Sequence, residues 1–288
     1  FKKYDQTKSF IKKLLEKSVE NQLLSDAPLG AFLSSGIDSS LIVSIMKDLK
    51  KDPQTFTIGF ENPDYDESRD AKKIADYLNT NHTEYIFSNN DVIKMIPSVG
   101  NAYSEPFADS SQIPTMLLSS ITASKVKVAL SGDGGDELFC GYNRYLYANR
   151  YWKIINFLPF NIRLKLVKLL RFMPNKILTQ LFILIIPKIR GSKFDHVDKI
   201  LDKLIKVKNG YSFYESMVTE WTSDDNILEF NNLVETHQYN TFKNFDEKNL
   251  LNSMMQADFN TYLSDDILCK VDRASMYYGL EVRAPFLM

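Results

Sequence analysis

Short apolar or β-branched segments alternate with stretches of helical periodicity through the first 130 residues of the chain. Such alternation predicts βα units, which build a parallel sheet covered by helices on both faces. The expected strands are Leu29–Leu33, Thr55–Phe60, His82–Phe87 and Val126–Leu130. We therefore expect an α/β fold with a doubly wound parallel sheet.

The helical stretches between these strands carry their apolar residues on one face. The stripe of the first helix is Phe10, Leu14, Leu15, Val19 and Leu23. A second helix is expected to begin near Asp38, a third to be capped by Asp66, and a fourth to cover roughly 111–124. These helices would cover the sheet.

In the second half of the chain the pattern changes to long Leu, Ile, Lys and aromatic stretches with few strand signals. We expect a helical subdomain over 144–255, inserted between core segments 1–143 and 256–288. Its periodic apolar residues are typical of a packed core, so no chemistry is assigned to them. The apolar run Leu181–Pro187 is far shorter than the roughly 20 residues that span a bilayer, and we expect it to form a buried helix.

Composition disfavours several classes of protein. With 288 residues, 44% of them hydrophobic, and a net charge of −1, the chain can bury a sizeable core but has no basic surplus for binding nucleic acid. Cys140 and Cys269 stand far apart, and the three histidines are dispersed, which argues against a disulfide scaffold or a zinc site. No secretory signal opens the chain at Phe1. We expect a cytoplasmic protein that binds neither nucleic acid nor membrane.

The stretch SSGIDSS, Ser34–Ser40, follows the first expected strand directly. Ligands of doubly wound sheets bind at this end of the strands, beside helix N-termini. Gly36 permits a ligand to approach the backbone closely, and hydroxyl donors surround it. These donors are Ser34, Ser39 and Ser40. The loop suits phosphate, and Asp38 beside a phosphate requires a cation such as Mg²⁺. Taken alone, the loop could instead be a simple helix cap.

The stretch SGDGGDE, Ser131–Glu137, follows the fourth expected strand. It contains three acids and three glycines in seven residues, and Asp136 is expected to face the same cation as Asp38. An exposed hairpin or a calcium loop is the alternative, although the ligand spacing and distal Glu of an EF-hand are missing. A Walker loop and a GxGxxG fingerprint are also absent, which disfavours a kinase and a dehydrogenase.

Three motifs together resemble a known family. FLSSGIDSS resembles the SGGxDS pyrophosphate loop of the ATP pyrophosphatases. LSGDGGDELFCGY and KVDRASMYYGLEVRAPFL resemble the synthetase domain of glutamine-dependent asparagine synthetases. The resemblance covers nearly the whole chain and is weakest across about 144–255. It implies an adenine nucleotide alpha-hydrolase-like fold in an asparagine synthetase domain, 1–288, that is truncated at both ends.

The resemblance also implies an activity. ATP with Mg²⁺ would activate the side-chain carboxylate of aspartate as an acyl adenylate, releasing pyrophosphate, and ammonia from glutamine would then displace AMP to give asparagine. The expected partners are aspartate, glutamine or ammonia, and an N-terminal glutaminase domain in the full-length protein. A second copy of the chain, forming a homodimer, is a further candidate partner.

Each motif position has a role in that family. The positions expected to bind the nucleotide are Leu33, Ser34, Gly36, Asp38, Ser39, Ser40, Ile58, Ser131 and Gly132. Adenine would lie near the backbone of Leu33 and Ile58. The positions expected to hold Mg²⁺ are Asp38 and Asp136. Asp133 would lie near the amino-acid substrate, and Tyr142 would line the acyl site.

The third motif carries four charged residues, Asp272, Arg273, Glu281 and Arg283. Substrate contact, with Asp272 and Arg273 as catalytic residues, is one interpretation. An internal ion-pair network that braces the sheet is the other, and the sequence leaves both open.

The chain departs from the family at Ser35, which replaces the first Gly of SGGxDS, and at Cys140, which stands where Gly is usual. We expect Cys140 to be a small buried thiol rather than a reactive one, and Ser35 has no functional account. PFLM replaces the family's PFLD at 285–288, and a phosphate-contacting lysine is expected after Met288. Two other activities stay open: an adenylating amidotransferase or cyclase acting on another carboxylate, and an ATP-binding module without turnover.

Overall fold

The computed structural model describes most of the chain. The described residues are 3–49, 52–62, 66–174, 177, 178, 180, 201, 202, 204–219 and 245–288. The expected buried helix Leu181–Pro187 lies outside them. The chain divides into two compact units, unit 1 from Phe1–Cys140 with Thr261–Met288, and unit 2 from Gly141–Asn260. The domain boundaries expected from the sequence stay a prediction.

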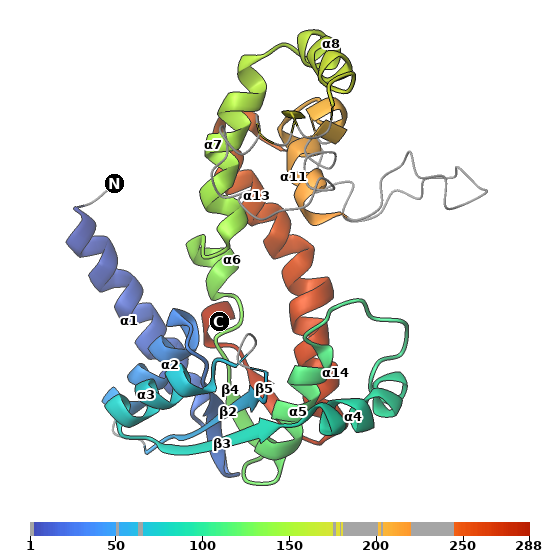
Figure 1. The fold of residues 1–288 in the computed structure, drawn as a ribbon. Helices are drawn as coiled ribbons and strands as arrows, with labels where there is room; N and C mark the ends of the chain where they lie inside the picture. The colour runs from blue at the N-terminus through green and yellow to red at the C-terminus, as the bar shows by residue number, and fades with distance from the viewer. Residues whose placement is uncertain are drawn as a thin grey trace. The chain divides into compact units, whose positions relative to one another are not determined.

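Unit 1 is built on a five-stranded parallel sheet with the strand order β3-β2-β1-β4-β5 (Figure 1). Its strands are β1 Leu29–Phe32, β2 Gln54–Phe60, β3 Asn81–Phe87, β4 Val128–Leu130 and β5 Glu281–Arg283. The first four lie within two residues of the expected strands, whereas β5 was not expected. The chain order reverses at β1, since β2 extends the sheet on one side and β4 on the other. The doubly wound fold is therefore confirmed.

Helices cover both faces of this sheet because successive residues of each strand point to opposite faces. Ala31 of β1 packs in a core with helices α1, α2 and α3, whereas Phe32 packs in a core with α5. A further core joins α4, α5 and α14. The bounds are α1 Tyr4–Gln22, α2 Ile37–Asp48, α3 Ser68–Leu78, α4 Asn89–Ala102, α5 Gln112–Ala123 and α14 Cys269–Tyr277.

Two details of the helices differ from expectation. Only the C-terminal part of the α1 stripe is covered: Val19 is fully buried, but Phe10 and Leu14 are 63% and 54% exposed. Asp66 acts one position before the N-cap residue Glu67, because its Oδ1 accepts a hydrogen bond of 3.1 Å from the first N–H of α3. The sequence therefore predicted both helices correctly, but not how much of the α1 stripe is covered or at which position Asp66 caps α3.

The elements described in unit 2 are helical, as expected. They are α7 Asn143–Phe157, α8 Phe160–Leu170, α11 Gly210–Val218, η4 Glu247–Asn249 and α13 Leu250–Asn260. Asp258 is fully buried among them and accepts hydrogen bonds from the hydroxyls of Tyr145 and Tyr214. Among the described helices of both units, none is long and apolar enough to cross a membrane.

Candidate functional site

The two glycine-and-acid loops meet beside β1 and β4, where the strand order reverses. A Cβ built on Gly132 would lie 2.7 Å from the backbone nitrogen of Ser39, and one built on Gly135 would lie 2.4 Å from Cγ of Asp38. A Cβ at either position would force a neighbouring group to shift, so glycine allows the loops to touch. Open α/β sheets bind ligands at such a reversal point. The structure thus brings together the two loops that the sequence singled out.

The first loop is braced by its own serines. The backbone N–H of Ser34 donates to Oγ of Ser39 at 3.1 Å, and the two hydroxyls share a hydrogen bond of 2.9 Å. The Ser40 hydroxyl donates to the carbonyl of Gly36 at 2.7 Å. Ser34 and Gly36 are exposed, and Gly36 is the N-cap of the twelve-residue helix α2. The loop therefore presents helix N–H groups and the Ser34 hydroxyl to solvent, which suits an anion, whereas Ser39 is buried.

Ser35, the departure from the family pattern, has a partner. Its hydroxyl donates to a carboxylate oxygen of Glu67 at 3.0 Å. Glu67 is the N-cap residue of α3, at the end of the connection that follows β2, so this bond ties the first loop to the neighbouring βα connection. The serine therefore restrains the loop, a role that no local pattern indicated.

The backbone of Ile58 lies beyond the end of β1. The ladder between β1 and β2 ends with the N–H of Leu33 donating to the carbonyl of Phe56 at 3.0 Å. In a parallel sheet, the backbone groups of every second residue point toward the same neighbouring strand. Ile58 is two residues after Phe56, so its backbone groups point toward the β1 side of β2, where β1 has ended. The Leu33 carbonyl accepts a hydrogen bond from the Thr57 hydroxyl, which leaves its second lone pair for a ligand.

Acidic side chains gather where the loops meet. The pKa of the Asp38 carboxyl is raised to about 6, first by burial and then by neighbouring negative charge. The contributing acids, in order of effect, are Asp136, Glu137 and Asp133. A cation would relieve this repulsion. Among the described residues no group of three His, Cys, Asp or Glu side chains is arranged to hold a metal ion, so Asp38 and Asp136 fit Mg²⁺ only together with phosphate oxygens.

Asp133 lies in the second loop, directly after Ser131 and Gly132. Burial raises the pKa of its carboxyl, while a hydrogen bond with the Ser131 side chain and the charge of Lys270 act in the opposite direction. The N–H of Ser131 donates to the carbonyl of Arg283 at 2.8 Å, so β5 braces this loop. A carboxylate held in this way can bind an ammonium group.

Lys270 is a residue that sequence reasoning missed. It is 7% exposed on α14, and its Nζ lies 2.6 Å from Oδ2 of Asp109 and 2.7 Å from Oγ of Ser111. Its spacing to Ala274, which is fully buried one turn later, is the only local signal that it faces inward. Asp109 lies in the connection before α5, and the sequence of this connection showed no motif.

The charged residues of the third motif separate into two groups. Arg283 donates from Nη1 to the carbonyls of Gln22 and Leu24, at 2.6 and 2.8 Å, and from Nε to Glu281. These bonds cap the C-terminal end of α1, so this pair braces the fold. Asp272 and Arg273 are exposed on α14. The Arg273 guanidinium donates to the hydroxyl of Ser104 at 3.0 Å, and Ser104 lies between α4 and α5, outside the two loops.

The segment after the second loop contains Cys140 and Tyr142. Cys140 has a left-handed backbone with φ of 63°, which explains why glycine suits this position. Cys140 is only partly buried, not buried as expected, and this partial burial raises the pKa of its thiol. Tyr142 belongs to unit 2, where the guanidinium carbon of Arg144 lies 4.0 Å from the centroid of its ring.

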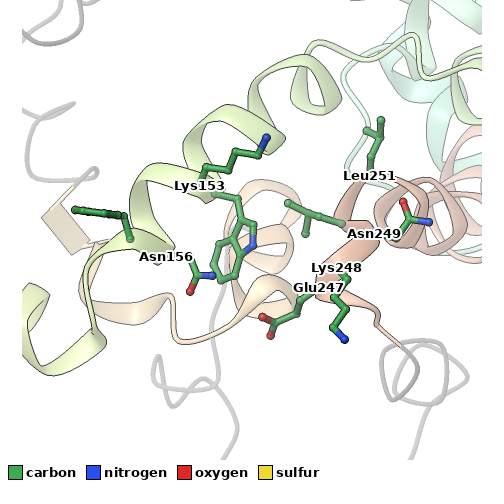
Figure 2. A pocket seen from close by; sticks show the side chains of 9 residues that line it. Lys153, Asn156, Glu247, Lys248, Asn249 and Leu251 are labelled. Carbon is green, nitrogen blue, oxygen red and sulfur yellow. The ribbon is translucent and has the colours of Figure 1, made fainter.

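A cavity of about 510 Å³ is lined by residues of unit 2. Figure 2 shows Lys153 and Asn156 of α7 on one side of it, and Glu247, Lys248 and Asn249 on another. None of its lining residues belongs to the glycine-and-acid loops or the third motif. The candidate site is therefore the loop junction of unit 1.

The fold and the loop junction define a parallel α/β protein of the adenine nucleotide alpha-hydrolase-like type. The asparagine synthase family profile matches residues 11–288, and the chain belongs to this family. A Methanocaldococcus jannaschii protein provisionally named asparagine synthetase (glutamine-hydrolyzing) 2 is 35% identical over 92% of this chain and 48% of its own length.

Two further relatives are similar to this chain, one over nearly all of it and one over about half. Asparagine synthetase (glutamine-hydrolyzing) 1 of Bacillus subtilis is 30% identical over 94% of this chain and 40% of its own length. Asparagine synthetase (glutamine-hydrolyzing) of Zea mays is 36% identical over 46% of this chain and 25% of its own length. The chain thus spans about half or less of the length of the relatives it matches.

Proposed function

We propose that the protein containing this chain synthesises asparagine from aspartate, ATP and glutamine-derived ammonia, and that this chain carries the synthetase site. The single observation that best supports the proposal is the junction of the two loops, where Gly132 and Gly135 lie against Ser39 and Asp38. Family membership and the provisional or established names of the relatives support the reaction.

The nucleotide would lie across the reversal point of the sheet. Adenine would bind the backbone of Leu33 and Ile58, and the triphosphate would contact the first loop and Gly132. The hydroxyls proposed to contact phosphate are those of Ser34, Ser39 and Ser131, with Gly36 and Ser40 shaping the cradle. Asp38 and Asp136 would hold Mg²⁺, which when bound neutralises charge on the phosphate oxygens.

The first chemical step forms an acyl adenylate. A side-chain carboxylate oxygen of aspartate attacks the α-phosphorus, the bond from that phosphorus to the bridging oxygen breaks, and pyrophosphate leaves. Asp133 would hold the ammonium group of aspartate, so that the reacting carboxylate is positioned for in-line attack. Donors of the first loop and Ser131 would stabilise the charge that develops on phosphoryl oxygens.

The second step forms the amide. Ammonia attacks the acyl carbon, the bond from that carbon to the AMP oxygen breaks, and the nitrogen loses one proton to leave asparagine and AMP. Tyr142, Asp272 and Arg273 are proposed to line the acyl substrate. A glutaminase domain elsewhere in the protein would supply ammonia, and we propose a homodimer in the cytoplasm.

The proposal is tested with the full-length gene product incubated with ATP, Mg²⁺, aspartate and either glutamine or ammonium. We expect AMP, pyrophosphate and asparagine in equal amounts. Asp38→Ala is expected to lower metal-dependent binding of ATP by about tenfold or more, because a charge-assisted ligand is lost. Asp70→Ala is the matched control, since Asp70 is 67% exposed on α3 and pairs only with Lys73 in the described structure.

Two results would contradict this function, and a third would contradict the role of Asp38. Pyrophosphate release with other carboxylates but not with aspartate would identify an adenylating enzyme of different acceptor. ATP binding without any AMP would identify a binding module. Equal ATP affinity in Asp38→Ala and Asp70→Ala would remove Asp38 from the metal site.

A further inference from the structure

A fully buried carboxylate, Asp258 of α13, has no part in the mechanism proposed above. Its Oδ1 accepts a hydrogen bond of 2.7 Å from the Tyr214 hydroxyl, and its Oδ2 accepts one from the Tyr145 hydroxyl. Nε and Nη2 of Arg144 also lie 3.0 Å from this Oδ2. A carboxylate is tolerated in the interior when it is paired with a cation and hydrogen-bonded in this way. Asp258 therefore fixes the Arg144 guanidinium in place.

The guanidinium that Asp258 holds lies over two aromatic rings. Its carbon atom is 4.0 Å from the centroid of the Tyr142 ring and 5.5 Å from the centroid of the Tyr145 ring. The two ring centroids are 5.6 Å apart, with 56° between the ring planes. A planar guanidinium is attracted to the face of an aromatic ring, and this attraction grows with desolvation. Because the Arg144 side chain is only 21% exposed, its contact with Tyr142 restrains that ring.

Tyr142 occupies a position that needs such a restraint. It is the N-cap residue of α7, and its own side chain makes no capping hydrogen bond. Helix ends fray more readily than helix interiors. Arg144 lies two residues further on, and Asp258, 114 residues later in the chain, connects it to α13. Tyr142 itself is only partly buried, so part of its side chain stays accessible.

We propose that Arg144, held by Asp258, is a positioning residue that fixes the Tyr142 ring against the acyl substrate. The inference rests on the proposed function, in which Tyr142 lines the acyl site. Arg144 and Asp258 do not themselves touch the substrate in this arrangement. They act through the ring, and all three residues belong to unit 2, whereas the residues proposed to bind ATP belong to unit 1. Their loss should therefore weaken binding of the amino acid and not of ATP.

The test uses the full-length protein with ATP, Mg²⁺, aspartate and ammonium, and compares KM for aspartate with KM for ATP. Arg144→Met is expected to raise KM for aspartate about tenfold, within the range that a partly desolvated cation–π contact gives, and to change KM for ATP by less than about twofold. Arg171→Met is the matched control. Arg171 also belongs to unit 2 and pairs with Asp202, but its side chain is 44% exposed, and its loss should change neither KM.

A double-mutant cycle tests whether Arg144 acts through the Tyr142 ring. Tyr142→Phe keeps a ring beneath the guanidinium, so Arg144→Met should still raise KM for aspartate about tenfold in that background. Tyr142→Leu removes the ring and should itself raise KM for aspartate. Adding Arg144→Met to Tyr142→Leu should then raise it by less than about twofold further, because the contact is already lost. A residue that only supports the fold would not distinguish the two backgrounds.

A second variant separates positioning from misfolding. Arg144→Met alone leaves the buried Asp258 without its cation, which destabilises the folded state. The double variant Arg144→Met with Asp258→Asn leaves no unpaired charge in the interior. It should show the same raised KM for aspartate as Arg144→Met, while urea unfolding measures its stability.

Three results would overturn the inference. Equal effects of Arg144→Met in the Tyr142→Phe and Tyr142→Leu backgrounds would show that Arg144 does not act through the ring. An unchanged KM for aspartate in the folded double variant with Asp258→Asn would make the network only structural. An unchanged KM for aspartate in Tyr142→Leu would remove Tyr142 from the acyl site. All three leave the wild-type reaction intact, whereas the proposed function fails if the wild-type protein itself forms no AMP with aspartate.

Discussion

Gly135 lies so close to Asp38 that a Cβ on the glycine would stand 2.4 Å from Cγ of the carboxyl. The contact joins two loops that lie about a hundred residues apart in the sequence. It also sets the position of the carboxylate that the proposed metal needs. A methyl group at Gly135 would therefore displace the Asp38 side chain and leave the fold intact, because a side chain can move aside more easily than backbone.

Gly135→Ala is expected to displace the Asp38 side chain and to weaken metal-dependent binding of ATP by about tenfold, while the protein stays folded. Calorimetric titration with a non-hydrolysable ATP analogue and Mg²⁺ measures the effect. Gly100→Ala is the control, because a Cβ at Gly100 of α4 would meet nothing within 4 Å. Equal affinities in the two variants would contradict the importance of the contact.

The raised pKa of Asp38 predicts how stability changes with pH in the absence of nucleotide. The carboxyl titrates near 3.8 when unperturbed and at about 6 in the folded protein, so the folded state binds the proton more tightly. Stability should therefore fall as pH rises from about 4 to about 6. Asp38→Asn removes this loss and should stabilise the protein at about pH 8 by about 1 kcal/mol, a value reduced for solvent screening.

Urea unfolding of wild type and Asp38→Asn at about pH 4 and about pH 8 tests this expectation. The two proteins should differ much less in stability at the lower pH, where the carboxyl is protonated in the folded state and partly protonated in the unfolded state. Equal stabilisation by Asp38→Asn at both pH values, or no stabilisation at about pH 8, would contradict this expectation. Binding of ATP with Mg²⁺ should also weaken below about pH 6, because a protonated carboxyl is a poor metal ligand.

Cys140→Gly is expected to increase the free energy of unfolding by about 1 kcal/mol, because glycine adopts a left-handed backbone without steric cost. Cys140→Ala is the matched control, since alanine keeps the Cβ and should bring no gain. Denaturant unfolding measures both. A thiol reagent should modify Cys140 slowly at neutral pH, as its raised pKa implies, and rapid modification would contradict the assignment as an inert thiol.

Arg283 and Arg273 should behave in opposite ways when each is replaced by Met. Arg283→Met removes the charged donor from two carbonyls at the end of α1, so we expect a loss of about 2 kcal/mol in stability with kcat/KM retained. Arg273→Met should change stability by less than about 0.5 kcal/mol, because the side chain is exposed, but should lower kcat/KM. If Arg273→Met lowered stability while Arg283→Met lowered only kcat/KM, the roles assigned to the two arginines would have to be exchanged.

The sequence predicted those parts of the site whose chemistry is local. Ser34–Ser40 and Ser131–Glu137 each concentrate small, hydroxyl and acidic residues directly after an apolar strand, and the parallel fold places such loops at one edge of the sheet. The first four strands were recognisable for the same reason. β5 was not, since Val282 is its only apolar residue between Glu281 and Arg283.

What escaped prediction depends on contacts between distant segments. Lys270 and Asp109 are 161 residues apart, and neither lies in a stretch whose local pattern indicates an ion pair. The link from Ser35 to Glu67 likewise joins different loops. Burial of Lys270 is a property of the packed helices, and within α14 only its spacing to Ala274 indicates it.

The bond that Arg283 accepts from Ser131 also has a consequence for the order of folding. The two residues are separated by 152 positions, and the cost of closing a loop rises with its length. Strands β1 to β4 can associate earlier during synthesis, whereas β5 must wait until nearly all the described chain has emerged. The second loop therefore gains its final support late, and a ribosome-bound chain that stops before β5 should be unable to capture a nucleotide firmly.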